Sequence, residues 1–362
     1  MNPKLSKVEK LQHEMREANI DIIIAPLGIN FRWLYKIKEE PSERLLITII
    51  GSEDPPKFLV PAFESDRIKK VTGGSDVTGW EETENPLTIL ANDIIPKSVK
   101  TIGIEPKLWF SVYQSISHCL PGKEFVNAEK LFNSLRMVKD EFEIKKMQQA
   151  YKKTSEVIIK TLYELEQGLT EFEVQSILKN RLLWGANESV FSLVQFGDNS
   201  ALPHYHGGDR QLKRDDVVLI DAGGTVENYW GDITITSVFG KASDKFKEIF
   251  ELVNQANIRG KELAIQGRTP HDIDLGTRDV ISKKGYGKFF THRTGHGLGL
   301  EVHEHPYILE GNKTPLRTGN CFTIEPGIYL PGKFGIRIED NVIKMDDGIS
   351  ASEIPRFELL EI

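Results

Sequence analysis

A histidine-rich stretch, Phe290–Pro306, reads FTHRTGHGLGLEVHEHP and holds four of the chain's nine histidines. They are His292, His296, His303 and His305, and glycines and two glutamates lie between and beside them. Imidazole nitrogens bind transition metals, and they also exchange protons near neutral pH. The stretch could therefore hold a metal ion, move a proton, or do both with different histidines.

Two acidic residues flank a predicted turn upstream of this stretch. Asp221 ends the apolar run VVLID, and Asp232 begins DITIT after the segment AGGTVENYWG. If the two runs pair as a hairpin, their carboxylates come together, and a carboxylate beside so apolar a run needs a cationic partner. On this pair alone an alternative stays open, in which Asp221 caps a turn at Gly223–Gly224 and Asp232 is an ordinary first residue of a strand.

A second pair of acids follows the histidine-rich stretch. Glu325 ends CFTIE, and Glu339 lies in GIRIED, where strand alternation puts Arg337 and Glu339 on one face. Four carboxylates and one imidazole are the ligand inventory of a two-metal site, whereas the alternative is a set of surface acids and ordinary buried histidines. Because zinc usually takes two or three His or Cys ligands, this set favours manganese, with cobalt or zinc as alternatives.

The elements that must position these residues change character near residue 135. Before it, short apolar runs (DIIIAPL, RLLITII, KFLVP, TIGIEP) alternate with helical stretches at Lys4–Ala18 and Leu108–Cys119. This pattern predicts a small α/β domain over residues 1–134.

Residues 135–362 begin with a long charged helix, for which Gly168 is the predicted C-cap. Thr170 and Glu173 then form a capping-box pattern that predicts a second helix. The runs SVFSLVQF, DVVLIDAG and DITITSVFG read as strands, followed by helices at Ser243–Gln266 and from Thr269, and then by short strands and glycine turns. Helices followed by strands, twice over, indicate an α+β domain with a mostly antiparallel sheet.

Composition excludes several classes of protein. With 39% hydrophobic and 27% charged residues, the 362-residue chain reads as a globular protein. A net charge of −7, spread along the chain, gives no electrostatic case for nucleic acid. No apolar run approaches the roughly 20 residues of a membrane span, and the N-terminus has no apolar signal core, so we expect a cytoplasmic protein without a membrane partner. Cys119 and Cys321 are expected to be free thiols.

The motifs together resemble those of the pita-bread metallopeptidases, the family of methionine aminopeptidase, aminopeptidase P, prolidase and the metal-free creatinase. The segments that carry the resemblance are IDAGG…YWGDITIT, THRTGHGLGLEVHEHP, TIEPGIYLPG and GIRIEDNV, with FGDNSALPHY upstream. The N-terminal GINFRWLYKI and the junction LRMVKDEFEIKKM resemble the two-domain, proline-specific branch. The resemblance implies a pita-bread catalytic domain, an antiparallel sheet covered by helices, preceded by a smaller creatinase-type α/β domain.

Carried over residue by residue, the resemblance implies which side chains hold the metals and which line the site. The implied metal ligands are Asp221, Asp232, His296, Glu325 and Glu339, with Asp232 and Glu339 shared by two ions. The implied residues without a metal are His204, His292 and His303 in the active site, Arg337 behind Glu339, and Tyr229 at the pocket edge. The other histidines are expected at the surface or in turns: His13, His118, His206, His271 and His305.

These parts imply a definite chemistry. Two ions roughly 3.5–4 Å apart lower the pKa of a shared water from about 15.7 toward neutrality, which supplies a hydroxide nucleophile. Glu325 would take the proton and pass it to the leaving nitrogen, while His303 helps to stabilise the oxyanion. His204 and His292 would position the substrate.

One residue departs from the family pattern. Ile235 stands where arginine is usual, so that DITRT is here DITIT. Alternation puts position 235 on the opposite face from Asp232 and Thr234. We therefore expect a change in packing or in an outer salt bridge rather than a loss of metal binding.

The resemblance implies an exopeptidase that cleaves the Xaa-Pro bond of small peptides, most simply a Xaa-Pro dipeptidase acting as a homodimer. Aminopeptidase P, which acts on longer peptides beginning Xaa-Pro, stays open because the motifs do not separate the two, although the short N-terminal domain favours the dipeptidase. A metal-free hydrolase is disfavoured because all five ligands are present. From another class, a catalytically silent protein-binding module would be expected to lack ligands.

Overall fold

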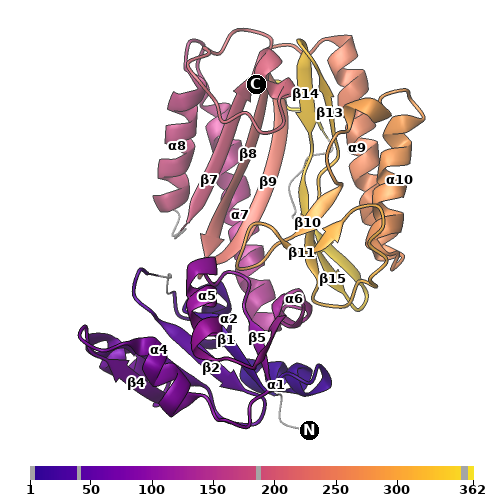
Figure 1. Ribbon diagram of the computed structural model, residues 1–362. Helices are drawn as coiled ribbons and strands as arrows, with labels where there is room; N and C mark the ends of the chain where they lie inside the picture. The colour runs from indigo at the N-terminus through magenta and orange to yellow at the C-terminus, as the bar shows by residue number, and fades with distance from the viewer. Residues whose placement is uncertain (1–4, 39–41, 185–188, 352–357) are drawn as a thin grey trace. The chain divides into compact units, whose positions relative to one another are not determined.

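The computed structural model describes residues 5–38, 42–184, 189–351 and 358–362. The chain divides into two compact units, one ending at Arg136 and the other beginning at Met137 (Figure 1). Within the described ranges, no helix combines the length and apolar character that crossing a membrane requires.

The N-terminal unit is built on a six-stranded mixed sheet in the order β4-β3-β2-β1-β5-β6. Its strands are β1 (Ile22–Pro26), β2 (Ile47–Gly51), β3 (Lys57–Pro61), β4 (Asp76–Trp80), β5 (Thr101–Ile104) and β6 (Glu124–Asn127). Its helices are α1 (Lys7–Glu17), α2 (Ile29–Tyr35), α3 (Ser65–Val71), α4 (Pro86–Ile89), α5 (Phe110–Cys119) and α6 (Glu129–Arg136), with short turns η1 (Ala62–Glu64) and η2 (Leu90–Ile94). Strand β1 pairs antiparallel with β2 and parallel with β5.

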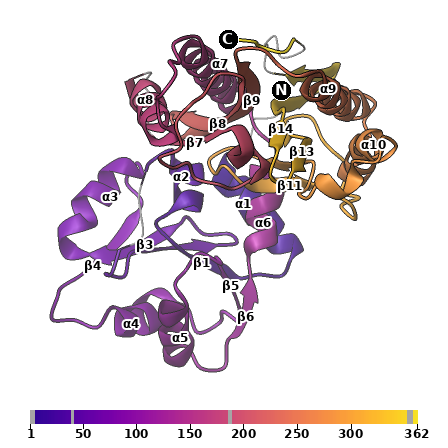
Figure 2. The same cartoon turned by 90° about the horizontal axis from the view of Figure 1, so that it is seen from above.

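Helices cover both faces of this sheet, as an α/β domain requires. Figure 2 shows α3 on one side of the sheet and α4 with α5 on the other. All five residues of β1 are buried, and Ile22 and Ile24 pack in one apolar core with Ile116 of α5. The unit therefore confirms the predicted α/β domain. Strands β4 and β6 were not predicted, because DVTGW and EFVN are short and weakly apolar.

The C-terminal unit contains three sheets, and every pair of its named strands is antiparallel. The first sheet is β7 (Val190–Phe196), β8 (Asp216–Val226) and β9 (Tyr229–Phe239). The second has the order β11-β10-β12-β15-β16, with β10 (Gly295–Gly297), β11 (Glu304–Ile308), β12 (Cys321–Ile324), β15 (Asp340–Met345) and β16 (Gly348–Ala351). The third is the pair β13 (Gly327–Leu330) and β14 (Phe334–Arg337).

Four helices cover these sheets in two pairs (Figure 1). They are α7 (Glu141–Tyr163), α8 (Glu171–Trp184), α9 (Asp244–Ile265) and α10 (Pro270–Ser282), with short turns η3 (Gly197–Ala201) and η4 (Gly287–Phe289). One apolar core joins α7 and α8 to β7, β8 and β9. Two others join α9 and α10 to the remaining strands. An antiparallel sheet covered by helices is the predicted pita-bread arrangement, which the structure confirms.

Of the first two helices of this unit, α7 ends before its predicted C-cap, whereas α8 starts as predicted. Helix α7 ends at Tyr163, and Gly168 lies beyond it at φ +94°, where its N–H donates to Leu212, so Gly168 is not the C-cap. The capping box before α8 is confirmed, because the Glu173 N–H donates to the Thr170 hydroxyl at 3.2 Å.

A tight hairpin joins β8 to β9. Its turn consists of Glu227 and Asn228, which have φ values of 48° and 70°, the left-handed conformation that suits a two-residue hairpin. Asp221 therefore lies in mid-strand, and the segment AGGTVENYWG is mostly strand rather than the predicted loop.

Glycine within β8 has a packing role. A Cβ added at Gly223 would lie 2.3 Å from the Phe191 ring and 2.8 Å from the Gly231 carbonyl oxygen. Because Gly223 and Gly224 are extended residues of the ladder, the alternative in which Asp221 caps a turn at these glycines is wrong.

Candidate functional site

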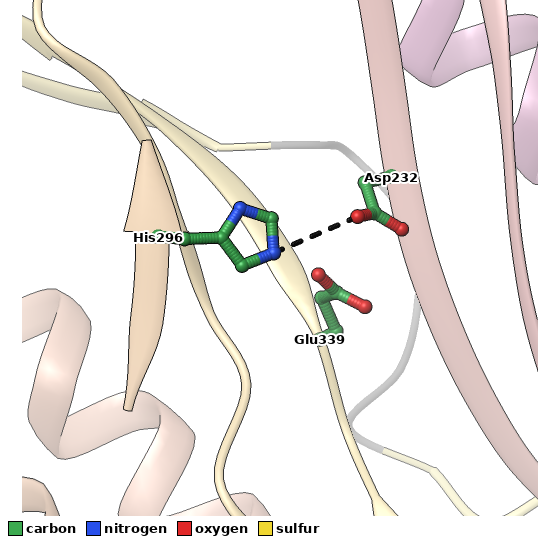
Figure 3. A group of neighbouring side chains, drawn as sticks. All are labelled: Asp232, His296 and Glu339. Carbon is green, nitrogen blue, oxygen red and sulfur yellow. Dashed lines mark ion pairs between the residues drawn. The ribbon is translucent and has the colours of Figure 1, made fainter. Parts of the chain in front are cut away.

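Three predicted ligands from separate strands meet at one buried point. The ligand atoms of Asp232 on β9, His296 on β10 and Glu339 before β15 all lie within 4.8 Å of one another, and all three residues are buried. Figure 3 shows the three side chains pointing toward a common centre. This convergence could hold a metal ion.

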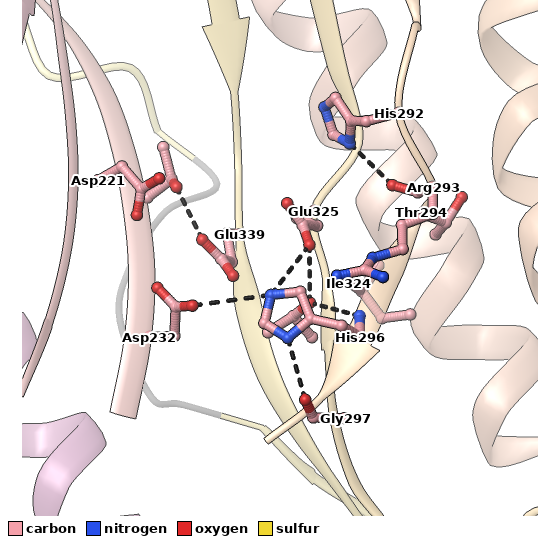
Figure 4. Close-up of polar contacts among 12 residues, drawn as sticks. Asp221, Asp232, His292, Arg293, Thr294, His296, Gly297, Ile324, Glu325 and Glu339 are labelled. Atoms are coloured by element: carbon pink, nitrogen blue, oxygen red, sulfur yellow. Dashed lines mark hydrogen bonds and ion pairs between the residues drawn. The ribbon is translucent and has the colours of Figure 1, made fainter. Parts of the chain in front are cut away.

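Two more carboxylates complete the cluster (Figure 4). The Nε2 atom of His296 lies 3.4 Å from Oε1 of Glu325 and 3.7 Å from Oδ2 of Asp232. Asp221 pairs with Thr234 across the β8–β9 ladder, so its side chain shares a face with those of Thr234 and Asp232. The hairpin thus brings the two aspartates side by side, as the sequence predicted.

Glycines allow β10 to carry His296 between β11 and β12. A Cβ at Gly295 would lie 1.9 Å from the Thr323 carbonyl oxygen, and one at Gly297 would lie 2.3 Å from the His305 carbonyl. No larger residue fits at either position without moving backbone. The sequence TGHG therefore places an imidazole where the backbones on both sides come very close.

The carboxylates repel one another and are poorly solvated. Burial, and then the neighbouring carboxylates, raise the pKa of Asp232 and that of Glu339 well above their usual range. Burial also raises the pKa of Glu325 to about 7. One buried carboxylate oxygen on each of Asp221, Asp232 and Glu339 has no hydrogen-bond partner among the described residues.

His296 presents a lone pair to these oxygens. Burial, and then the nearby His303, lower the pKa of His296 to about 3, so the ring is neutral. Its Nδ1 lies 3.0 Å from the Gly297 carbonyl oxygen, which can only accept, so Nδ1 carries the proton and Nε2 does not. A neutral Nε2 and carboxylate oxygens repel unless a cation lies between them. The residues present therefore fit divalent metal ions.

Arg337 reaches a different carboxylate from the one predicted. Its guanidinium donates to Asp221 Oδ2 at 2.6 Å and to the Thr234 hydroxyl at 3.0 Å, and Thr234 in turn donates to Glu339 at 2.7 Å. Arg337 is the last residue of β14 and Glu339 lies just before β15, so the two do not belong to one strand. Arg337 thus bonds Asp221 directly and Glu339 only through Thr234.

Three further histidines were predicted to line the site without binding metal. His292 is half-buried, its Nε2 lies 2.8 Å from the Tyr329 hydroxyl, and burial lowers its pKa to about 3. The ring of His303 meets that of His296 edge-on with centroids 4.3 Å apart, and partial burial lowers the pKa of His303. His204 is exposed, and it is near enough to His292 and His303 to be the least of the causes of their lowered pKa values.

Two further predicted residues face elsewhere. Tyr229 is buried, and its hydroxyl donates to Glu143 on α7 at 2.8 Å, so the contact packs β9 on the helix and a role at the pocket edge stays a prediction. Ile235 packs in the core under α7 and α8, on the face opposite Asp232, as alternation predicts.

Sequence reasoning missed Tyr329 and Asn341. The Tyr329 hydroxyl accepts from Arg337 at 2.9 Å and joins it to His292. The Asn341 side chain accepts from the Asp232 N–H at 3.2 Å. Both lie within or next to the quoted motifs, but only strand pairing, which a sequence does not show, brings them to the site.

Comparisons with known proteins agree with this geometry. A model of metallopeptidase family M24 matches residues 145–344, and one of the creatinase/prolidase N-terminal domain matches residues 7–138. A putative dipeptidase of Bacillus subtilis (strain 168) is 31% identical over 360 residues, which cover 97% of this chain and 99% of that protein.

Solved structures are similar over the whole chain. A prolidase from Thermococcus sibiricus has 30% identity and a TM-score of 0.90, covering 99% of this chain and 100% of that one. An X-Pro aminopeptidase from Thermotoga maritima has 32% identity and a TM-score of 0.84, covering 97% of this chain and 100% of that one.

Proposed function

The chain belongs to metallopeptidase family M24, in the prolidase branch of the pita-bread fold, and from this premise we propose that it is a dinuclear-metal-dependent Xaa-Pro dipeptidase. The observation that carries the proposal is the buried convergence of Asp232, His296 and Glu339, whose ligand atoms lie within 4.8 Å of one another. Three buried carboxylate oxygens without a hydrogen-bond partner among the described residues support the proposal of a bound cation.

The metal site is proposed to use five residues. Asp221, Asp232, His296, Glu325 and Glu339 would hold the two ions. When bound, the ions would lower the pKa of a water and polarise the scissile carbonyl. Manganese is the proposed ion, because a set of four carboxylates and one imidazole is oxygen-rich.

Glu325 is the proposed general base. Its carboxylate lies 3.4 Å from His296 Nε2, within the proposed set of metal ligands, so it would stand beside a water held there. It would take a proton from water and return it to the leaving nitrogen.

Three histidines are proposed to act on the substrate. His303 lies edge-on to His296, and its lowered pKa keeps it neutral, so it would donate a hydrogen bond to the oxyanion that forms on the scissile carbonyl. His292 is held by the Arg293 carbonyl oxygen and the Tyr329 hydroxyl, each at 2.8 Å, which would fix its ring against the substrate. His204, on an exposed loop, would bind the peptide as it enters.

The proposal extends to the setting in which the enzyme works. A homodimer is proposed from the resemblance to the prolidase branch. The two free cysteines, Cys119 and Cys321, suit the reducing cytoplasm, which is the proposed location.

The second candidate is an aminopeptidase P activity on longer Xaa-Pro peptides, favoured by the similarity to the X-Pro aminopeptidase from Thermotoga maritima. A silent protein-binding module is the candidate from another class, and the complete ligand set argues against it.

A hydrolysis screen tests these candidates. Ala-Pro and Ala-Pro-Ala would be offered to the protein with manganese, cobalt and zinc in turn, with Ala-Ala and Met-Ala as controls. A dipeptidase cleaves Ala-Pro well and Ala-Pro-Ala poorly, whereas an aminopeptidase P does the reverse. Cleavage of Ala-Ala or Met-Ala without Ala-Pro would contradict the substrate class while leaving the metal site standing.

A further inference from the structure

The loop that carries His204 has no regular structure of its own. Between η3, which ends at Ala201, and the bridge residue Gln211, the chain forms neither helix nor strand, and His204 is exposed. A side chain that must meet a substrate needs support from residues on rigid elements. The position of His204 relative to the proposed metal ligands therefore depends on the side chains that bond to this loop.

Gln195 makes two hydrogen bonds that bracket His204. Its Nε2 donates to the Leu202 carbonyl oxygen at 3.0 Å and to the Tyr205 carbonyl oxygen at 2.9 Å, and the side chain is fully buried. Because carbonyl oxygens only accept, both N–H bonds of the amide must face the loop. Its Oε1 has no hydrogen-bond partner among the described residues, so these two carbonyls set the orientation of the amide.

Strand pairing puts Gln195 on the same sheet face as one of the proposed metal ligands. In the β7–β8 ladder, Gln195 pairs with Leu219 and Leu193 pairs with Asp221, so alternation puts the side chains of Gln195 and Asp221 on one face. The residues on either side of Gln195 in β7, Val194 and Phe196, point the other way into the core under α7 and α8. The face that presents Asp221 thus also presents the amide that holds the loop.

Other side chains hold the flanks of the loop. The Gln175 amide donates to the His206 carbonyl oxygen at 3.0 Å. The buried carboxylate of Glu171 accepts from the Phe196 N–H at 2.7 Å and from the Asn199 amide at 2.9 Å. These bonds fix where the loop leaves and rejoins the body of the unit. The bonds of Gln195 instead reach Leu202, two residues before His204, and Tyr205, one residue after it.

We propose that Gln195 is a positioning residue, which fixes His204 relative to the proposed metal ligands. It does so through its two hydrogen bonds to the Leu202 and Tyr205 carbonyl oxygens, which we call the clamp. What His204 then does to a peptide rests on the proposed function. The clamp itself does not, because it depends only on the hydrogen bonds between β7 and the loop.

The test begins with Gln195→Met, which keeps the length of the side chain and removes both donors. Hydrogen–deuterium exchange should become at least ~10-fold faster in residues 202–208 and stay unchanged in β8 and β9. Turnover of Ala-Pro should fall by roughly 10–100-fold at unchanged metal content, because a displacement of about 1 Å can cost 10²-fold. Should Gln195→Met not fold, Gln195→Leu also removes both donors without burying a charge, and it is judged by the same measurements.

The control is Gln12→Met in the N-terminal unit. Gln12 clamps two carbonyl oxygens in the same way, those of Gly51 at 2.9 Å and Asp54 at 2.8 Å. This variant should exchange faster around its own two partners and keep wild-type kinetics, so a kinetic loss confined to Gln195→Met belongs to the loop.

A double-mutant cycle with His204→Ala decides whether Gln195 acts through His204. If it does, adding Gln195→Met to His204→Ala lowers kcat/KM by less than about 2-fold more. The proposal would be overturned if the loss of kcat/KM in the double variant equalled the product of the losses in the two single variants. Unchanged hydrogen–deuterium exchange in residues 202–208 of Gln195→Met would also overturn it. If the wild-type protein cleaves no Xaa-Pro peptide, the proposed function fails, and exchange alone then judges the clamp.

Discussion

The guanidinium of Arg337 donates a hydrogen bond of 2.6 Å to Oδ2 of Asp221, and only 5% of the Arg337 side chain is exposed. The same guanidinium bonds the Thr234 hydroxyl, which donates to Glu339. One buried cation thus orients two of the carboxylates and offsets part of their charge. The arrangement prepares the site for metal ions and does not replace them, because four carboxylates still outnumber it.

Replacing Arg337 should weaken the site in two graded steps. Arg337→Lys keeps the charge but cannot make three bonds in a fixed fork, so we expect a 10–100-fold loss of metal affinity or turnover with the fold intact. Arg337→Met leaves Asp221, whose side chain is 16% exposed, beside other acids and without its cation. It should also lower the melting temperature, because removing one partner of a buried pair costs up to about 3–5 kcal/mol and this pair is mostly buried. Titration with manganese and thermal unfolding measure both effects, and equal behaviour of the two variants would contradict them.

Local patterns predicted much of this site. The hairpin that joins Asp221 to Asp232 was predicted from two apolar runs around a glycine-containing segment, and the glycines around His296 indicate close backbone contact. These features are encoded within a few residues of one another, where strand alternation and turn chemistry act.

Long-range partners could not be predicted in this way. The Lys139 ammonium lies 2.6 Å from the Glu304 carboxylate, with side chains only 2% and 5% exposed, although 165 positions separate them. The Arg337–Asp221 bond likewise joins strands of different sheets. Nothing in the sequence near Lys139 or Arg337 specifies which acid the folded chain brings to it, because that depends on how separate strands pack.

Removing the metals should abolish activity and reduce stability together. Once the cations are gone, Asp232 and Glu339 must be buried beside other acids, which favours their protonation and opposes folding at neutral pH. Chelator-treated protein should be inactive, melt at a lower temperature, and regain both properties best with manganese or cobalt. Activity assays beside elemental analysis check this, and full activity in a preparation without transition metals would rule out the proposed mechanism.

A buried carboxyl in the N-terminal unit should make stability depend on pH. Burial raises the pKa of Glu105 from 4.5 to about 7, despite hydrogen bonds from Lys107 and Asn30. A raised pKa means that the folded state holds the proton more tightly than the unfolded state. Its stabilisation is therefore complete below pH 4.5 and is lost as pH rises through about 7, at a cost on the order of 3 kcal/mol.

Thermal unfolding of the metal-loaded protein at pH 5 and pH 7 measures this effect. From pH 5 to pH 7, the melting temperature of the wild type should fall further than that of Glu105→Gln, because glutamine cannot ionise. Glu17→Gln, at an exposed position of the same unit, should behave as the wild type does. Equal pH dependence in the wild type and Glu105→Gln would show that Glu105 does not titrate in this range.

The last prediction separates the ligand from the catalytic group among neighbouring histidines. His296 is 3% exposed, and its Nε2 lies between Asp232 and Glu325, so His296→Ala should lose metal and activity together. His303 meets the His296 ring only edge-on and is exposed on its other side. His303→Ala should therefore keep near-normal metal content and fold while losing roughly 10²–10⁴-fold in turnover, the scale of a positioned proton-transfer or oxyanion group.

Metal analysis and steady-state kinetics on the same preparations decide between the two histidines. His305→Ala is the control, because His305 packs against Tyr307 with ring centroids 4.7 Å apart and should retain both metal and turnover. The kcat of His303→Ala should fall at unchanged metal content, since a group that acts on the developing oxyanion stabilises the transition state more than the bound substrate. If His303→Ala loses its metal while His296→Ala keeps it, the two roles are reversed: His303 is then the metal ligand and His296 the catalytic group.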